Sequence, residues 1–425
     1  MVVGIAAIMF FNLVDTFWVG QLGPLELAAM GFTFPVTMVI SNLTIGLSIG
    51  ASAVIARAIG ASEQQKVQRL TTDALLLSLI VVLCASALGL AFMHPLFVQL
   101  GADAQTLPLI EDYMRPWFWG VGLLVIPMLG NGAIRATGDS RSPAFIMVVA
   151  GLINAVLDPL LIFGLGPIPA MHLTGAALST VISYAFATAV ALWILIKREH
   201  MVTFRAVALR QVLASFRRIL GIGLPASATN LLTPLSSAVV TRLVAEHGAT
   251  AVAAYGVGVR VESLSMMGIF ALTGAITPVV GQNMGAGQFG RIEETRRFAA
   301  RAALVWGLPI ALLLALFAEP LAWLFNDEEN VVRITVAYMR IVPCSYAGFG
   351  LAILTASMFN ALNVPLRATF IALVRLVILA LPLAYVGSRM AGIEGLFAGV
   401  AAANILVGIL ALAMGRAYGR SGAYV

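Results

Sequence analysis

Long apolar segments follow one another along almost the whole chain, and this pattern limits what the chain can fold into. Runs of 18 or more mostly apolar residues recur from one end to the other, and each is long enough to cross a bilayer as a helix. Lipid cannot satisfy free backbone polar groups, so each run is most simply a transmembrane helix. Only 10% of the 425 residues are charged and the mean hydropathy is +0.99, whereas soluble domains carry about 25% charged residues. The sequence therefore predicts an all-α integral membrane protein.

Twelve of these segments are expected to span the membrane as helices. Several exceed the roughly 20 residues that a bilayer requires, which indicates tilted helices or helices that continue beyond the lipid. The predicted spans are residues 1–19, 25–56, 70–93, 107–134, 142–163, 173–196, 216–241, 250–284, 298–318, 332–362, 368–387 and 392–415.

The basic residues are distributed unevenly between the two sides of the predicted membrane. Of the 25 Lys and Arg, 18 lie at the C-terminus or in, or within four residues of, connections after even-numbered spans, 3 lie in or within four residues of connections after odd-numbered spans, and 4 lie deeper within spans. Basic loops stay on the cytoplasmic side, so both termini are expected to be cytoplasmic, in a bacterial plasma (inner) membrane. Membrane topology thus explains the net charge of +6, and no nucleic-acid partner is expected.

The two halves of the chain resemble each other at a constant offset of 225 residues. The motif YMR occurs in both halves, and no gap is needed between residues 28 and 115. A constant offset over that length indicates a tandem duplication. The matching pairs are AAMG at 28–31 with AAYG at 253–256, GA at 60–61 with GA at 285–286, and YMR at 113–115 with YMR at 338–340.

A duplication of six spans gives two halves in the same orientation, related by an axis along the membrane normal. We therefore expect two pseudo-symmetric six-helix bundles, an N-lobe at 1–196 and a C-lobe at 216–425, joined by a basic cytoplasmic linker at 197–215. Such folds bind substrate between or within the halves and alternate access by rocking. The offset places the counterpart of Pro225 before residue 1, so span 1 is expected to be shorter at its start than span 7. A chain start later than the natural one would explain this.

Asp15 is a carboxylic acid within the otherwise apolar segment FFNLVDTFWVG. An ionised Asp at the centre of a transmembrane helix costs roughly 2.5–3.5 kcal/mol on insertion, and an apolar environment favours the neutral acid. Asp15 is therefore a candidate proton carrier. Asn12 shares a helix face with Asp15 and with Thr16, so Asn12 and Thr16 are candidate residues of a polar substrate pocket. The alternative is a carboxylate near the outer end of span 1 that reaches the headgroup water.

A second acid, Asp158, follows Asn154 by four residues in span 5, so both project from one helix face. Pro159 has no amide hydrogen and frees the carbonyl of Ala155, which can join a polar cluster. Asp15, Asp158 and Asn154 are therefore the candidate proton- or cation-coupling residues. The alternative for Asp158 is a helix-end carboxylate that marks the outer boundary of the membrane.

The second half also carries ionic residues within predicted spans, namely Arg260 and Glu262 in span 8 and Arg375 in span 11. Intramembrane ions are functional candidates. Arg260 and Glu262 are two residues apart, so they point in different directions along the helix, whereas Glu262 and Arg375 could pair across helices. A structural ion pair that fixes helix packing explains these residues equally well.

Aromatic and thioether side chains gather in span 4, at Trp117, Phe118, Trp119 and Met128. Sites that accept many ligands often use Met and aromatic groups that repack around each ligand. Trp119 and Met128 are therefore included in the candidate substrate pocket. The alternative for Trp117 and Trp119 is an aromatic belt at the membrane interface.

The motifs in the sequence do not favour an enzyme. The chain has no His-Glu-x-x-His, and its Gly-x-Ser-x-Gly at residues 46–50 lies within the predicted span 25–56, not at a strand-to-helix turn. Cys84 and Cys344 lie in separate apolar segments and the four histidines are scattered, so neither a disulfide framework nor a metal site is expected. No cofactor is expected, and H⁺ is the expected coupling ion.

Several segments resemble the MATE (multidrug and toxic compound extrusion) family, and the resemblance covers the whole chain. It implies a V-shaped alternating-access transporter of twelve helices that exports amphipathic, often cationic drugs or dyes in exchange for H⁺ or Na⁺. It also places Thr180 of span 6 in the polar pocket, although a Thr in a membrane helix often bonds its own backbone instead. The acid pair, Asp15 and Asp158, resembles the DinF-type branch, in which a proton site lies in the N-terminal half. The segments are NLVDTFWVGQLG (12–23), IGASAVIARAIGA (49–61), GNGAIRATGDSRSP (130–143), INAVLDPLLIFGLG (153–166), GAALST (175–180) and GAITPVVGQNMGAG (274–287).

Proton coupling is favoured over sodium coupling by the same resemblance. The Na⁺-coupled branches place an acid in span 7 and another in span 10, and this chain has none in either. The resulting hypothesis is a proton-coupled multidrug efflux antiporter, expected to be a monomer, in which protonation of Asp15 switches span 1. The alternatives are a Na⁺-coupled antiporter of the family and a lipid-linked oligosaccharide flippase of the same superfamily. A flippase is disfavoured because the pocket of the first half is acidic and mid-membrane arginines are few.

Overall fold

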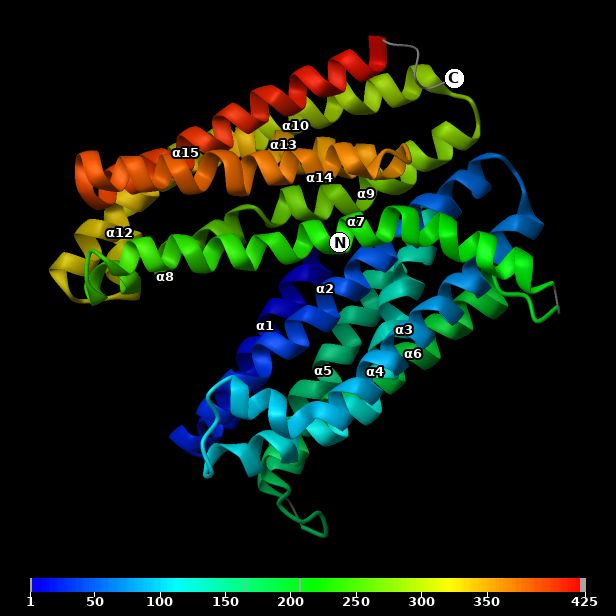
Figure 1. Ribbon diagram of the computed structural model, residues 1–425, viewed down its shortest axis with the longest axis horizontal. Coiled ribbons are helices and arrows are strands. Elements are labelled where there is room, and N and C mark those ends of the chain that lie inside the picture. The colour runs from blue at the N-terminus through cyan, green and yellow to red at the C-terminus, as the bar shows by residue number, and fades with distance from the viewer. Residues whose placement is uncertain (1, 165, 206–207, 421–425) are drawn as a thin grey trace. The chain divides into compact units, whose positions relative to one another are not determined.

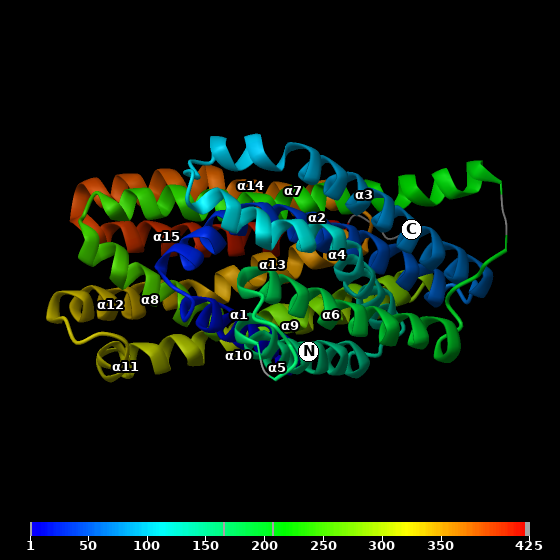
Figure 2. The ribbon, with the colours of Figure 1, turned by 90° about the horizontal axis from the view of Figure 1, so that it is seen from below.

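The computed structural model (Figure 1) describes residues 2–164, 166–205 and 208–420. The side chains of Ile5, Ile8, Met9 and Asn12 lie outside this description. The described residues contain no β-strand, and the two views in Figure 1 and Figure 2 show long helices running side by side within each half of the chain. The expected all-α class is confirmed.

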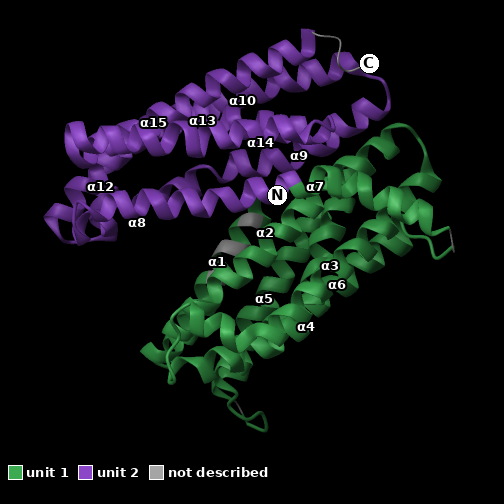
Figure 3. Cartoon of the chain, viewed as in Figure 1, with its two compact units in different colours: residues 1–224 green, residues 225–425 purple. Residues whose placement is uncertain are grey.

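The chain divides into two compact units, residues 1–224 and 225–425 (Figure 3). The boundary lies inside α7 (Leu209–Ala245), later than the expected start of the C-lobe at 216. The helices of the first unit before α7 are α1 (Val2–Gly20), α2 (Pro24–Gly60), α3 (Gln64–Gln99), α4 (Thr106–Ala136), α5 (Arg141–Phe163), α6 (His172–Trp193) and the π-helical turn η1 (Ile194–Arg198). Those of the second unit after α7 are α8 (Ala249–Ser265), α9 (Met267–Gly285), α10 (Phe289–Leu316), α11 (Ala318–Phe325), α12 (Glu329–Ile341), η2 (Val342–Ser345), α13 (Tyr346–Ala361), α14 (Pro365–Leu373), η3 (Val374–Ala380) and α15 (Leu381–Arg420).

Each predicted span has a helical counterpart, but several spans are interrupted. Span 8 is the helix pair α8 and α9, bent by 43°. Span 10 is α12 and α13, joined through η2 around Pro343, a residue without an amide hydrogen. Spans 11 and 12 run from α14 into α15, which kinks at Ala391 and Gly392. By length and composition, eight described helices could cross a membrane, or nine if the bent pair counts as one span.

One central helix organises the packing of each unit. α4 packs against α2, α3 and α6, and α13 packs against α9, α10 and α15. The most apolar stretch is 72% buried in α4 and 67% buried in α12–α13, but only 22% buried in α3 and in α10. α4 and α13 therefore fill the cores, while α3 and α10 present apolar side chains outward, as helices that face lipid do.

The internal repeat extends to the ends of the helices. Adding 225 to the bounds of α2, 24 and 60, gives 249 and 285, the start of α8 and the end of α9. The same offset carries the start of α3 at 64 to the start of α10 at 289, and the end of α4 at 136 to the end of α13 at 361. The duplication inferred from short motifs is therefore present in the helices themselves.

Backbone conformation at the helix junctions repeats as well. Positive φ angles are rare outside glycine and close tight turns after helices. Three such positions recur at the offset of 225, so the two halves change direction in the same way. The pairs are Gly23 (153°) with Gly248 (98°), Ser62 (58°) with Gly287 (67°), and Gly138 (98°) with Asn363 (64°).

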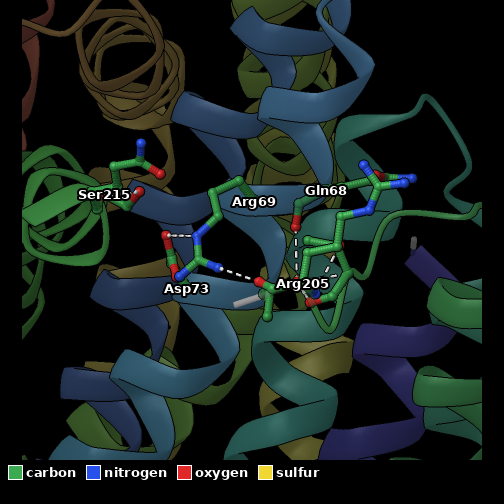
Figure 4. A network of polar contacts seen from close by, with 8 residues as sticks. Gln68, Arg69, Asp73, Arg205 and Ser215 are labelled. Atoms are coloured by element: carbon green, nitrogen blue, oxygen red, sulfur yellow. Dashed lines mark hydrogen bonds and ion pairs between the residues drawn. The ribbon is translucent and has the colours of Figure 1, made fainter. Parts of the chain in front are cut away.

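The first part of the basic linker is bound to the first unit. The amide of Gln68 donates to the carbonyl oxygen of His200 at 3.0 Å, and the amide of Thr203 donates to Thr72 Oγ1 at 3.0 Å. Figure 4 shows Gln68 with its hydrogen bond to the linker, beside the ion pair of Arg69 and Asp73. The end of the predicted linker, residues 209–215, is already the start of α7.

An ion pair next to this contact fixes the linker to the turn between α4 and α5. Arg198 donates to Asp139 Oδ2 at 2.6 Å and to Ser142 Oγ at 2.8 Å. Partial burial raises the pKa of Asp139, but hydrogen bonds from Ser142 and Arg198 outweigh it and lower this pKa to about 2. Asp139 is therefore ionised at neutral pH, and its charge anchors the linker.

Candidate functional site

A polar cluster joins α5 and α6 inside the first unit. Asn154 Nδ2 lies 3.1 Å from Asp158 Oδ1, 3.1 Å from Ser179 Oγ and 3.5 Å from Thr180 Oγ1. The hydroxyl of Ser179 also donates to Asp158 Oδ1. Asp158 is fully buried, so these contacts replace the water that the carboxyl group has lost. The expected shared face of Asn154 and Asp158 is confirmed.

Asp15 of α1 belongs to the same site. α1 packs against α5, and Asp15 and Asp158 interact electrostatically. Oδ1 of Asp15 and Oδ2 of Asp158 are buried, and neither has a hydrogen-bond partner among the described residues. Two carboxylates in one apolar site repel each other when both are ionised. The arrangement is therefore suited to holding a proton or another small cation.

Two tyrosines lie close enough to Asp15 to interact with it electrostatically. Tyr113 of α4 and Tyr184 of α6 both interact electrostatically with Asp15, and Tyr113 is only 6% exposed. A phenol can donate a hydrogen bond to a carboxylate or accept one from a carboxylic acid. The site thus takes side chains from α1, α4, α5 and α6, and each of these helices belongs to the first unit.

Three of the residues in this cluster were not identified from the sequence. Ser179 is next to Thr180 in the motif GAALST, but only packing of α5 on α6 shows that Ser179 is the residue bonded to Asp158. Thr180 instead donates to the carbonyl of Ala176 in its own helix at 3.1 Å. The repeated YMR motif could have drawn attention to Tyr113. Nothing in the sequence indicates that Tyr184 belongs to the site.

Among the other predicted pocket residues, Trp119 and Met128 are not joined to this cluster by any described contact. The side chain of Asn12 lies outside the described residues, and Thr16 is exposed. Trp119 is 78% exposed, while Met128 is half-buried and packs against the apolar core around α4. Trp117 is only 4% exposed, so the interfacial-belt interpretation is wrong for Trp117. The substrate-pocket roles of Thr16, Trp119 and Met128 stay predictions.

The second unit contains a separate, partly buried cluster around Glu262 of α8. Tyr338 of α12 donates to Glu262 Oε2 at 3.0 Å. Arg375 of η3 stacks over the ring of Phe349 at 4.2 Å and interacts with Glu262 electrostatically, but no direct ion pair between them occurs in the described structure. Arg260 is exposed. Glu262 is therefore hydrogen-bonded to Tyr338, and the pairing with Arg375 considered from the sequence is not a direct ion pair.

The close packing of α5 on α6 depends on Gly175. A Cβ atom at this position would lie 2.4 Å from the carbonyl oxygen of Leu161 and 2.9 Å from the amide nitrogen of Ile162, both backbone atoms. We expect Gly175→Ala to destabilise the protein by about 1–3 kcal/mol, because overpacking forces backbone shifts. Gly31→Ala is the matched control, since nothing lies within 4 Å of its added Cβ. Thermal unfolding of both variants in detergent tests this, and equal midpoints would contradict it.

Comparison with known proteins agrees with this architecture. The family model MatE matches residues 1–160 and 225–386, one segment in each half. A FAD transporter of Shewanella oneidensis is 41% identical over 407 residues, covering 96% of this chain and 90% of that protein. The multidrug export protein MepA of Staphylococcus aureus is 22% identical over 422 residues, covering 97% and 90%. The crystal structure of the Vibrio cholerae MATE transporter VcmN in the bent form is 32% identical with a TM-score of 0.94, covering 100% of this chain and 96% of that one.

The duplicated helical fold and its buried acid cluster thus define a multi-pass membrane transporter. The chain belongs to the MATE family. The resemblance seen in the sequence is confirmed at this level, whereas the DinF-type branch stays a prediction.

Proposed function

We propose that this transporter is a proton-coupled efflux antiporter for amphipathic, often cationic compounds, with both termini in the cytoplasm. The observation that supports it most is the pair of carboxyl groups on α1 and α5, each with a buried oxygen that has no partner among the described residues. A site built in this way gains a partner when it takes up a proton or an organic cation. Sodium coupling is disfavoured because α7 and α13 carry no acidic residue.

α1 is the element whose position the proton would control. α1 packs chiefly against α5, and Phe10, Leu13 and Phe17 remain 57–69% exposed along its other side. With Asp15 ionised, the acid pair attracts a cationic compound. Protonation of Asp15 removes that attraction, and α1 then bends or slides into the pocket and expels the compound. Proton and compound must therefore weaken each other's binding by the same factor.

Export of a flavin nucleotide is a second candidate, favoured by the 41% identity to the FAD transporter of Shewanella oneidensis. FAD carries a diphosphate and is an anion, so an ionised acid pair would repel it. The two candidates therefore differ in the charge of the compound that the site accepts. They share the fold, the family and the need for a coupling ion.

Uptake into everted vesicles distinguishes the two candidates. We expect a proton gradient with an acidic vesicle interior to drive accumulation of ethidium, which is followed by its fluorescence. Under the same gradient we expect little accumulation of radiolabelled FAD and little inhibition of ethidium uptake by FAD. Vesicles without the protein correct for passive entry. Proton-driven accumulation of FAD without ethidium would replace the proposal with flavin export, and accumulation driven by Na⁺ alone would overturn proton coupling.

A further inference from the structure

A cavity of about 410 Å³ lies between the start of α10 and the end of α15 in the second unit. Four of its lining residues are arginines and one is a glutamate, so the cavity is strongly basic. The lining residues are Phe289, Glu293, Arg296, Arg297, Arg416, Gly419 and Arg420.

Charge within the cavity is only partly compensated. Glu293 accepts from Arg296 at 2.5 and 2.7 Å and from Arg297 at 3.0 Å, so one carboxylate binds both of the α10 arginines that line the cavity. Arg416 and Arg420 of α15 are exposed and form no ion pair in the described part of the chain. One negative charge against four positive charges leaves a site that attracts an anion.

The cavity lies at the edge of the apolar surface that lipid would cover. On α10 the apolar side chains of Phe298, Val305 and Leu312 are 59–73% exposed, starting one residue after Arg297. On α15 the last such residue is Ile409, 60% exposed, seven residues and about 10 Å before Arg416 at 1.5 Å per residue. The arginines therefore stand at the depth of the lipid headgroups, next to the hydrocarbon.

At the equivalent position in the first unit, the start of α3 is covered by the linker. At the offset of 225, Gln68 corresponds to Glu293 and Thr72 to Arg297. Gln68 and Thr72 bind the linker at His200 and Thr203, as Figure 4 shows for Gln68. In the second unit the same two helix positions line the basic cavity.

We propose that the arginine cavity binds a phosphate-bearing anion, and that its depth points to the headgroup of an anionic phospholipid as the source. Arginine forms paired hydrogen bonds with phosphate oxygens, and basic pockets between membrane helices on one side of a bilayer bind such headgroups. The site is independent of the acid pair. Its occupant would hold the ends of α10 and α15 together at the membrane surface.

Native mass spectrometry of the purified full chain tests the lipid source. The protein is incubated with equal amounts of phosphatidylglycerol and phosphatidylcholine, both of which carry phosphate but only the first of which has a net negative charge. We expect wild type to retain phosphatidylglycerol preferentially. In R416Q/R420Q we expect the ratio of bound phosphatidylglycerol to bound phosphatidylcholine to fall roughly tenfold. The matched control is R210Q/R217Q, which removes two exposed arginines of α7 outside the cavity. Thermal unfolding checks that both double variants are folded.

A second arm tests a soluble source with inorganic phosphate and ADP, read as a shift in the thermal unfolding midpoint. A shift in wild type that R416Q/R420Q lacks, without a preference for phosphatidylglycerol, would support the phosphate site but assign it to a soluble anion. Equal lipid retention and equal shifts in wild type and both double variants would overturn the proposal.

Discussion

Replacing Asp15 with asparagine is expected to reduce proton-driven efflux to background while leaving the protein folded. Asn has nearly the volume of Asp, so packing of α1 on α5 is kept, but it takes up no proton and carries no charge. The acid pair with Asp158 then loses the group that links proton uptake to movement of α1. The measurement is ethidium accumulation in everted vesicles, driven first by a proton gradient alone and then by a Na⁺ gradient alone.

Asp112→Asn is the matched control, because Asp112 is an exposed aspartate of α4 in the same unit. We expect this control to transport at the wild-type rate. If Asp15→Asn still drives proton-coupled efflux at that rate, Asp15 does not couple transport to protons. If Na⁺ alone drives wild type, the acid pair is a cation site and the proton switch is wrong.

The features that the sequence predicted correctly are those that a bilayer or a single helix determines. Lipid requires long apolar helices, so the spans could be placed from composition alone. The shared face of Asn154 and Asp158 follows from one helical turn within α5. The offset of 225 residues, found in three short motifs, recurs in helix ends and in turn positions such as Ser62 and Gly287.

Contacts between helices could not be predicted in the same way. Ser179 and Tyr184 reach the acid site only because α6 packs on α5 and α4, and hydropathy carries no information on which helices meet. The same limit explains Glu262, which binds Tyr338 of α12 although Arg375 was the obvious partner by charge. It also explains Trp117, whose burial depends on the helices around α4. A membrane helix has apolar side chains on every face, so its sequence does not show which face is buried.

Ser179→Ala is expected to impair transport much more than Thr180→Ala. The hydroxyl of Ser179 is within hydrogen-bond reach of Asp158 and of the Ala176 carbonyl, the latter at 2.8 Å, whereas the hydroxyl of Thr180 donates to Ala176 and no described contact joins it to Asp158. Loss of a hydrogen bond to a buried carboxyl group costs about 1–3 kcal/mol, which corresponds to roughly 5- to 150-fold in rate if the cost falls on the transport step. Ethidium uptake rates in everted vesicles, measured over a range of ethidium concentrations, compare the two variants.

Ser179 is a positioning residue in this argument, because it acts by orienting Asp158. Ser179→Cys keeps a weak donor of similar size, so we expect it to transport faster than Ser179→Ala. Thermal unfolding of the three variants is the control. If all three unfold at the same temperature, a purely structural role for the side chain does not explain that recovery. Equal transport by Ser179→Ala and Thr180→Ala would show that the bond to Asp158 is not needed. The asymmetry between two adjacent hydroxyls is thus a direct test of whether Asp158 must be held in place for the acid pair to work.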